Sequence, residues 1–178
     1  MANLHALTVQ EATNLLKPRL LDVDCTTATS DHDENDVIFE WTEVTNFSRT
    51  NGEAVELTSA SMLLPAAMGD QKATVQLVFS RGIGTTGTEP AQIGALDGAV
   101  DMTRAEAQAA RICGSCVIGG VQDDLILSNV ASNKQGGLRL IMAPASASTS
   151  IWVAGIARDE PAAAFTDTTI NLYLGIYG

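Results

Sequence analysis

Residues 168–177 of the chain read Thr-Thr-Ile-Asn-Leu-Tyr-Leu-Gly-Ile-Tyr. Aliphatic side chains fill every second position from Ile170 to Ile176, whereas Asn171, Tyr173 and Tyr177 fall on the opposite parity. Successive side chains of a β-strand point to opposite faces, so this pattern predicts a strand with one buried face. The same period of two recurs through most of the chain, and it sets the fold class.

Seven further segments show β-type patterns. They begin at Val37 and continue at about Val55–Leu63, Ala73–Phe79, Arg111–Ile118, Leu125–Val130, Leu138–Ala143 and Thr149–Ala157. Turn residues separate them at Asn51-Gly52, Gly69-Asp70, Gly119-Gly120 and Gly136-Gly137. The first segment slips by one residue near Glu43, which indicates a β-bulge or a change of sheet. Eight short strands with almost no helix between them predict an all-β fold, a jelly-roll-like antiparallel β-sandwich.

The longest connection, Arg81 to Ala110, opens with the glycine-rich residues 82–87. They lack the Gly-Lys-Ser/Thr ending of a phosphate-binding loop, so we expect a mobile surface loop. At the far end, Thr103 and Glu106 have the spacing of a capping box in an alanine-rich sequence, which predicts a short helix. A connection of this length is expected to be a crossover between the two sheets.

The N-terminus has a helical signal of its own. Thr8 and Glu11 have the spacing of a capping box, so a short helix is predicted from Val9 to about Lys17. Pro18 cannot continue such a helix, because it lacks the backbone N–H. The helix would belong to an arm rather than to the β body.

The first 36 residues are therefore expected to form an N-terminal arm and an acidic linker, and residues 37–178 the β-sandwich domain. The stretch Cys25–Asp36 is polar and acidic without apolar periodicity, which is typical of a loop. Leucines lie outside the β pattern in this region and are candidate contacts with a neighbouring subunit. They are Leu4, Leu7, Leu15, Leu16, Leu20 and Leu21.

Composition excludes several classes of protein. The chain has 178 residues and a formal net charge of −11, and its ten basic residues form no stripe, so nucleic-acid binding is not expected. The apolar runs are too short to span a bilayer, so no membrane role is expected either. Three cysteines without a secretory signal indicate assembly in a reducing cytoplasm.

Cys113 and Cys116 form the C-x-x-C motif that redox enzymes use. In those enzymes the first cysteine sits at a helix N-terminus, which lowers its pKa. Here both flanks resemble a strand, and a regular strand places residues three apart on opposite faces. A redox or metal site is therefore disfavoured, and zinc would need further ligands.

Two other motifs fail on inspection. The acidic run Asp31–Asp36 resembles the start of a calcium loop, but it has Asp36 where glycine is required and Thr42 where glutamate is required. The only histidines, His5 and His32, precede the first strand of the body, and no nucleophile elbow accompanies them. No enzyme activity, cofactor or metal is predicted.

The order of segments resembles a family of small virion proteins of tailed phages, the capsid decoration or cement proteins. The residues that carry this resemblance are 37–46 with Arg49 and Asn51-Gly52, then 73–80 with the loop and helix that follow, and finally 136–140, 148–158 and 170–177. Together they cover about Val37 to Gly178. They are patterns of packing and turns, not catalytic signatures.

The resemblance implies a structural protein on the outer surface of the capsid, commonly a homotrimer at local three-fold positions. Its partner would be the major capsid protein, whose subunits it would bridge and stabilise after assembly in the host cytoplasm. The family supplies no catalytic residues. The first 36 residues do not match the family.

Two alternatives stay open at the level of sequence. One is a receptor- or carbohydrate-binding β-sandwich of a phage tail or fibre, which would need exposed aromatic side chains. Trp41 and Trp152 both fall on predicted strands, where core packing is the expected role. The other is an enzyme that uses Cys113 and Cys116.

Overall fold

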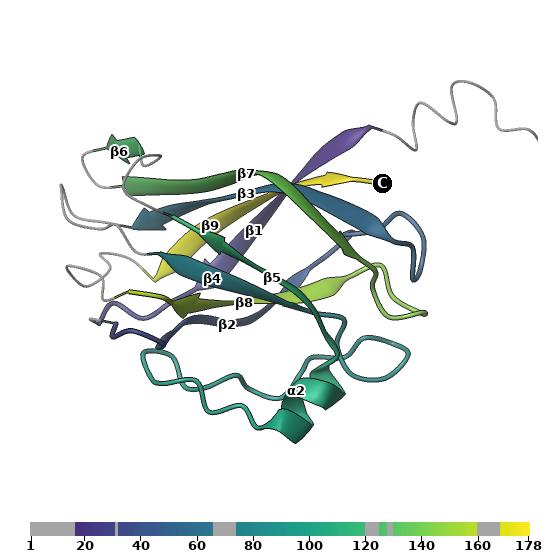
Figure 1. Cartoon of the computed structure of the whole chain (residues 1–178), viewed down its shortest axis with the longest axis horizontal. Coiled ribbons are helices and arrows are strands. Elements are labelled where there is room, and N and C mark those ends of the chain that lie inside the picture. The colour runs from purple at the N-terminus through teal and green to yellow at the C-terminus, as the bar shows by residue number, and fades with distance from the viewer. Residues whose placement is uncertain (1–16, 31, 66–73, 120–124, 128–129, 160–167) are drawn as a thin grey trace, which may run out of the picture.

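The computed structural model describes residues 17–30, 32–65, 74–119, 125–127, 130–159 and 168–178. Two antiparallel sheets pack face to face in this part of the chain, with a short helix and a long loop below them (Figure 1). The strands are β1 (Pro18–Thr26), β2 (Val37–Val44), β3 (Val55–Pro65), β4 (Val75–Ser80), β5 (Ile112–Ile118), β6 (Leu125–Leu127), β7 (Val130–Met142), β8 (Ile151–Ala157) and β9 (Thr169–Tyr177). The helix is α2 (Arg104–Ala110).

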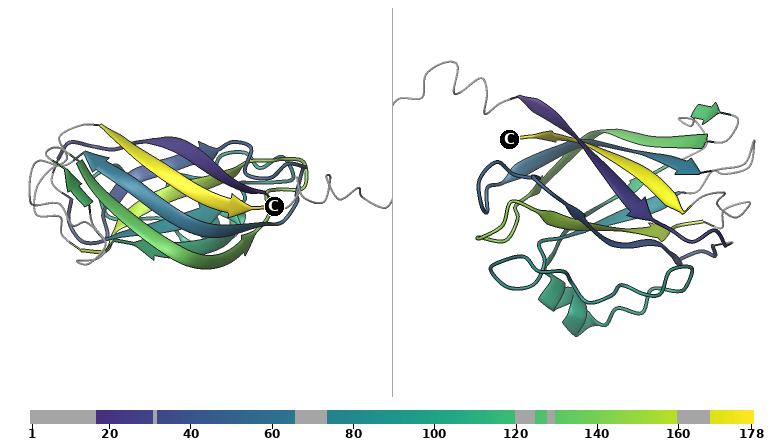
Figure 2. Two further views of the ribbon diagram at one scale, coloured as in Figure 1. Left: turned by 90° about the horizontal axis from the view of Figure 1, so that it is seen from above. Right: turned by 180° about the vertical axis from the view of Figure 1, so that it is seen from behind.

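The strand pairs show how the chain is wound. Antiparallel ladders join β1 with β9, β2 with β8, β3 with β7 and β4 with β5, so the chain is one long hairpin folded between β4 and β5. Rolling up this hairpin brings β9 beside β3 and β8 beside β4. The result is sheet A, in the order β1-β9-β3-β7-β6, and sheet B, in the order β2-β8-β4-β5. Figure 2 shows the two layers from above and from behind.

This winding is the jelly roll, which confirms the predicted fold class. Eight strands belong to the roll, and the short β6 is added at the edge of sheet A beside β7. The helix does lie in the long connection after β4, as predicted. That connection is not a crossover, however, because β4 and β5 are hydrogen-bonded neighbours within sheet B. The chain therefore stays in sheet B as it passes from β4 to β5.

The main core lies between the sheets, as the alternating patterns predicted. Ile170, Leu172, Leu174 and Ile176 of β9 are fully buried in it, while the residues between them face outward. Its largest side chains from other strands include Phe39, Phe79, Leu57, Met62 and Leu77. Side chains from both inner faces interdigitate in such a sandwich, and this burial is the main source of its stability.

A second core lies on the outer side of sheet B, beneath loop 81–103. It consists of Val37, Trp41, Ile93, Ala154 and Ile156, with Val78, Met102 and Trp152 packed around them. Both indoles also hold the loop: Trp41 Nε1 donates to the carbonyl of Ala91, and Trp152 Nε1 donates to that of Gly87, each at 2.9 Å. These contacts hold the loop over the centre of sheet B at Gly87 and Ala91, while residues 83–86 are exposed, and the expected mobility of residues 82–87 stays a prediction.

The capping box at the start of α2 is confirmed. The backbone N–H of Glu106 donates to Thr103 Oγ1 at 3.3 Å, and the N–H of Thr103 donates to Glu106 Oε2 at 2.8 Å. The hydroxyl of Thr103, which donates to Glu106 Oε2 at 2.6 Å, and then the N–H of Thr103 lower the pKa of Glu106. No helix in the described ranges is long and apolar enough to cross a membrane.

The structure places the boundary of the β body differently from the sequence analysis. Residues 18–26, assigned to the arm and linker, form β1 and pair with β9 along their whole length. Val23 and Cys25 are buried, whereas Asp22 and Asp24, which alternate with them, are exposed. This is the alternation of an edge strand, hidden in the sequence by the acidic residues around it. The predicted arm helix falls almost entirely on residues 1–16, outside the described residues.

Two irregularities of the sheets also differ from expectation. The slip in β2 lies between Val37 and Thr42 rather than near Glu43, since Ile38 and Phe39 both enter the main core. Gly136-Gly137 was expected to be a turn, but it lies inside β7, where the pairing with β3 shifts register. Gly137 has a φ of 69°, which a bulge tolerates at glycine.

Candidate functional site

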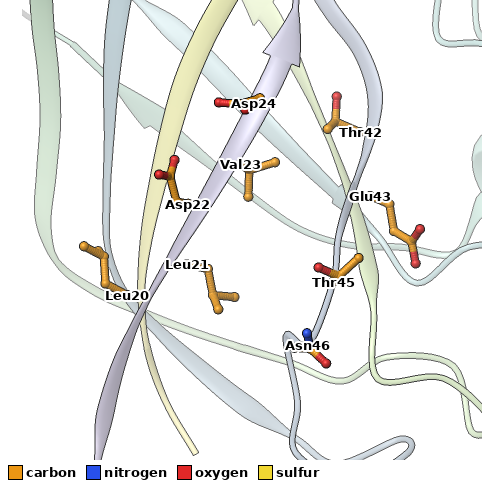
Figure 3. Close-up of a pocket in the computed structure, with 9 residues that line it drawn as sticks. All are labelled: Leu20, Leu21, Asp22, Val23, Asp24, Thr42, Glu43, Thr45 and Asn46. Carbon is orange, nitrogen blue, oxygen red and sulfur yellow. The ribbon is translucent and has the colours of Figure 1, made fainter.

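A groove opens between the edge strands β1 and β2, which belong to different sheets (Figure 3). One end is closed by a β-bridge between Thr27 and Phe39. At the other end the guanidinium of Arg19 crosses the gap and donates to the carbonyls of Asn46 at 2.9 Å and Phe47 at 2.7 Å. Burial, and then the nearby Arg49, lower the pKa of Arg19. The groove has a volume of about 300 Å³.

The lining of the groove combines an apolar floor with an acidic rim. Leu21 and Val23 point from β1 towards β2, while Asp22 and Asp24 lie on the other side of β1 (Figure 3). Asp24 Oδ1 accepts a hydrogen bond of 2.6 Å from Asn171 Nδ2. Glu43 of β2 points away from β1, so its carboxylate does not face a common point with those of Asp22 and Asp24 (Figure 3). Such a groove offers room for a side chain of a partner, and it lacks a nucleophile paired with a base.

The acidic run that resembled a calcium loop is held by internal contacts where the structure describes it. The Asp36 carboxylate accepts from the backbone N–H of Asp33 at 2.9 Å. The fully buried side chain of His32 lies with Nδ1 3.4 Å from Asp97 Oδ1, which ties this segment to loop 81–103. Across the described ranges, no group of three or more His, Cys, Asp or Glu side chains is arranged to hold a metal ion.

Cys113 and Cys116 lie on β5, as predicted, but not on opposite faces of it. Both pack against the main core, because the register of β4 and β5 shifts between Phe79 and Ser80 and breaks the alternation. Their thiols are free, and burial raises the pKa of each to about 11. A redox cysteine needs a lowered pKa, so this environment opposes thiolate chemistry.

We expect Cys113 and Cys116 to react with a thiol reagent at pH 8 far more slowly in the folded protein than in denaturant. A thiol with a pKa of about 11 instead of the ordinary 9.0 holds roughly 100-fold less thiolate at this pH. Burial also raises the pKa of Cys25 to about 12. Because the pKa values of these thiols are higher in the folded than in the unfolded state, their contribution to stability is complete below pH 9 and is lost as the pH rises through 11 and 12.

Denaturation curves at pH 8 and pH 10.5, followed by circular dichroism, measure this second effect. The free energy of unfolding should fall between the two values, and the fall should shrink in a Cys25→Ala, Cys113→Ala, Cys116→Ala variant. An equal fall in wild type and variant would show that the thiols do not cause it. Rapid labelling of the folded protein would contradict the first expectation.

The tryptophans do not form a ligand platform. Trp41 is 5% exposed, and Trp152 is half-buried at the margin of the second core. Their indole N–H groups are already bonded to the loop. This confirms the predicted packing role.

An apolar patch lies on the outer face of sheet A, and we call Pro18, Leu20, Ile141 and Tyr177 the sheet A patch. Leu20 is 69%, Ile141 70% and Tyr177 39% exposed. Register places Pro18 opposite Tyr177, and Glu56 of β3 opposite both Tyr177 and Ile141, so the patch spans four neighbouring strands. Exposed apolar groups gathered in this way mark interaction surfaces.

The leucines predicted as contacts are thus divided by the structure. Leu20 is exposed in the sheet A patch, whereas Leu21 is partly buried and packs against the main core. Leu4, Leu7, Leu15 and Leu16 lie outside the described residues. Ile141 and Tyr177 were not predicted as contacts, since they join the patch only through the pairing of distant strands.

No family model matches the sequence, and no curated protein matches it. Among solved structures, the chain is similar to a chain of the activated KBV particle at acidic pH, with 9% identity, a TM-score of 0.32, and coverage of 99% of this chain and 73% of that one. It is similar to a chain of black queen cell virus, with 10% identity, a TM-score of 0.32, and coverage of 99% and 74%. It is also similar to a chain of the empty capsid of Triatoma virus, with 8% identity, a TM-score of 0.31, and coverage of 100% and 76%. At these identities and TM-scores, the likeness assigns no function.

Proposed function

We propose that this protein is a structural component of a virus particle, which decorates and stabilises the outer surface of a tailed-phage capsid by bridging major capsid subunits. The sequence resemblance over residues 37–178 supports the proposal. The structural observation that carries it is the sheet A patch, an exposed surface through which one copy can contact a neighbouring copy in a particle. In the described residues, no group of His, Cys, Asp or Glu side chains is arranged to hold a metal ion, and the pKa values of the free thiols are raised.

The construction of the body suits such a role. Strands β2, β8 and β4 of sheet B pack on one side against the main core and on the other against the second core under loop 81–103, so loop and sheets form one stiff unit. A stiff protein loses little conformational entropy when it binds, and many copies on a shell bind with avidity from modest single contacts. Its three free thiols suit assembly in the reducing host cytoplasm.

Within this proposal the protein assembles as a homotrimer, and the N-terminal leucines Leu4, Leu7, Leu15, Leu16 and Leu20 contact a neighbouring subunit or the capsid. Leu21 is removed from that set, because it packs against the main core. An experiment on the arm must also respect β1. A deletion of residues 1–30 would remove β1 and with it a partner of β9, so a deletion of residues 1–16 is the suitable one.

Co-sedimentation with expanded, empty capsids tests the proposal. The capsids are assembled from the major capsid protein that the proposal expects to be encoded beside this chain. We expect saturable binding of the full chain at a fixed ratio to capsid subunits, and weaker binding of the chain without residues 1–16. Lack of a neighbouring capsid gene, or binding that does not saturate above a control protein of similar charge, would contradict the proposal.

Exposed tryptophans would have favoured carbohydrate binding, but Trp41 is buried and Trp152 is half-buried. Binding on a glycan array at micromolar concentration would reopen that alternative.

A further inference from the structure

The sheet A patch lies beside the point where the N-terminal segment joins the body. β1 begins at Pro18, which pairs with Tyr177, and Leu20 follows two residues later on the same outer face. The remaining member, Ile141, lies across β9 and β3 on β7. Strands are spaced about 4.8 Å apart, so the patch is roughly 14 Å wide, which suits one helix with its side chains.

The sequence of the N-terminal segment matches this surface. Val9, Ala12 and Leu16 follow at intervals of three and four residues, and Leu15 lies next to that line, so a helix of this sequence has one apolar face. Its other positions, including Gln10 and Asn14, are polar. A helix of this kind needs an apolar surface to cover.

The direction of the chain at Lys17 favours the patch of another copy. A residue that precedes proline favours the extended conformation, and Pro18 is already part of β1. Lys17 therefore enters β1 along the axis of this strand, at the end of sheet A, and not across its outer face.

We infer that residues 1–16 of one copy dock on the sheet A patch of a second copy. The inference deepens the homo-oligomer of the proposed function. Each copy offers one segment and one patch, so the contact is either exchanged between two copies or repeated around a ring. The exposed guanidinium of Arg139 is paired with Glu56 at 3.1 Å, and Glu56 lies between Tyr177 and Ile141, so the surface has a polar pair among its apolar residues.

Light scattering on size-exclusion columns tests the inference with full-length variants. Ile141→Glu and Leu20→Glu alter the patch, and Leu15→Glu alters the segment. Val117→Glu is the matched control, because Val117 is a 46% exposed residue on β5 of sheet B. We expect wild type and Val117→Glu to have a multiple of the 18.6 kDa chain mass, and the other variants to have the mass of one chain.

Mixing separates exchange between copies from folding back within one. A copy with Ile141→Glu keeps an intact segment, and a copy with Leu15→Glu keeps an intact patch. An equal mixture should therefore form complexes heavier than one chain. Three results would each overturn the inference: a wild type with the mass of one chain at about 100 µM, an unchanged mass of Ile141→Glu, or a mixture without complexes.

A peptide of residues 1–17 provides a second measurement that does not depend on the folding of variants. Added in excess to the wild-type protein, it should compete for the patch and lower the mass to one chain. The same peptide with Leu15→Glu should leave the mass unchanged. Equal effects of the two peptides, or none, would overturn the inference.

Capsid binding distinguishes this inference from the proposed function. If both hold, the single-chain variants should bind capsids about 100-fold more weakly through loss of avidity. Variants that keep their oligomeric mass but no longer bind capsids would make the patch a capsid contact, which overturns the inference and leaves the proposed function standing. An oligomer that behaves as described while no protein binds capsids would contradict only the proposed function.

Discussion

Replacing Gly155 with alanine is expected to lower the free energy of unfolding by about 3 kcal/mol, the upper part of the usual range for overpacking. Gly155 of β8 pairs with Phe39 of β2, and the ring of Phe39 lies over it. A methyl group there would lie 2.6 Å from Cδ1 and 2.8 Å from Cζ of that ring. Because Phe39 is fully buried in the main core, its ring has no free space into which to move.

A double-mutant cycle assigns the cause. Phe39→Ala alone should cost about 3–5 kcal/mol, since it leaves a cavity. In that background Gly155→Ala should cost less than about 0.5 kcal/mol, because the added methyl group enters the space that the ring has left. The measurement is urea denaturation followed by circular dichroism. If Gly155→Ala cost the same in both backgrounds, strain in the backbone of β8 would be the cause instead.

Trp41→Ala is expected to cost about 3–5 kcal/mol, because it empties the centre of the second core. The variant also leaves the carbonyl of Ala91 without its donor. Loop 81–103 should then be cleaved faster by protease while both sheets remain folded. Trp41→Phe, which keeps an aromatic ring and removes the N–H, should cost about 1–2 kcal/mol.

Trp152→Phe is the matched comparison for the second tryptophan. Trp152 Nε1 donates to the carbonyl of Gly87 at the same distance, 2.9 Å, as Trp41 Nε1 to that of Ala91. The side chain of Trp152 is only half-buried, so the cost should be smaller than for Trp41→Phe. Urea denaturation and limited proteolysis together separate global from local effects. A loss below 1 kcal/mol for Trp41→Ala, with no change in cleavage of the loop, would show that the second core does not hold it.

The strands could be predicted because their signal is local. In β9 the alternation of four buried aliphatic side chains gave both the strand and its inward face. β1 has the same alternation, but only Val23 and Cys25 are buried, and the aspartates between them made it resemble a linker. Glycine tolerates a positive φ in turns and in bulges alike, so Gly136-Gly137 fits both, and only the pairing with β3 decides between them.

The pairing itself and the candidate site depend on contacts between distant residues. Nothing local in the sequence indicates that Trp41 reaches the backbone of Ala91, fifty residues later. The sheet A patch likewise joins Leu20 and Ile141, which are brought to one face only by the register of four strands. Of its members, only Leu20 was predicted, because it stands outside the β pattern that the sequence showed.

The position of β9 between β1 and β3 has a consequence for synthesis on the ribosome. β1 leaves the ribosome among the first residues of the body, yet its ladder partner consists of residues 169–177, which leave it after the other named strands of the body. Until then β1 has no ladder partner, β3 is an open edge of sheet A, and the core lacks Ile170, Leu172, Leu174 and Ile176. A stop codon before residue 169 therefore yields a chain whose first strand has no partner, and such exposed edges favour aggregation.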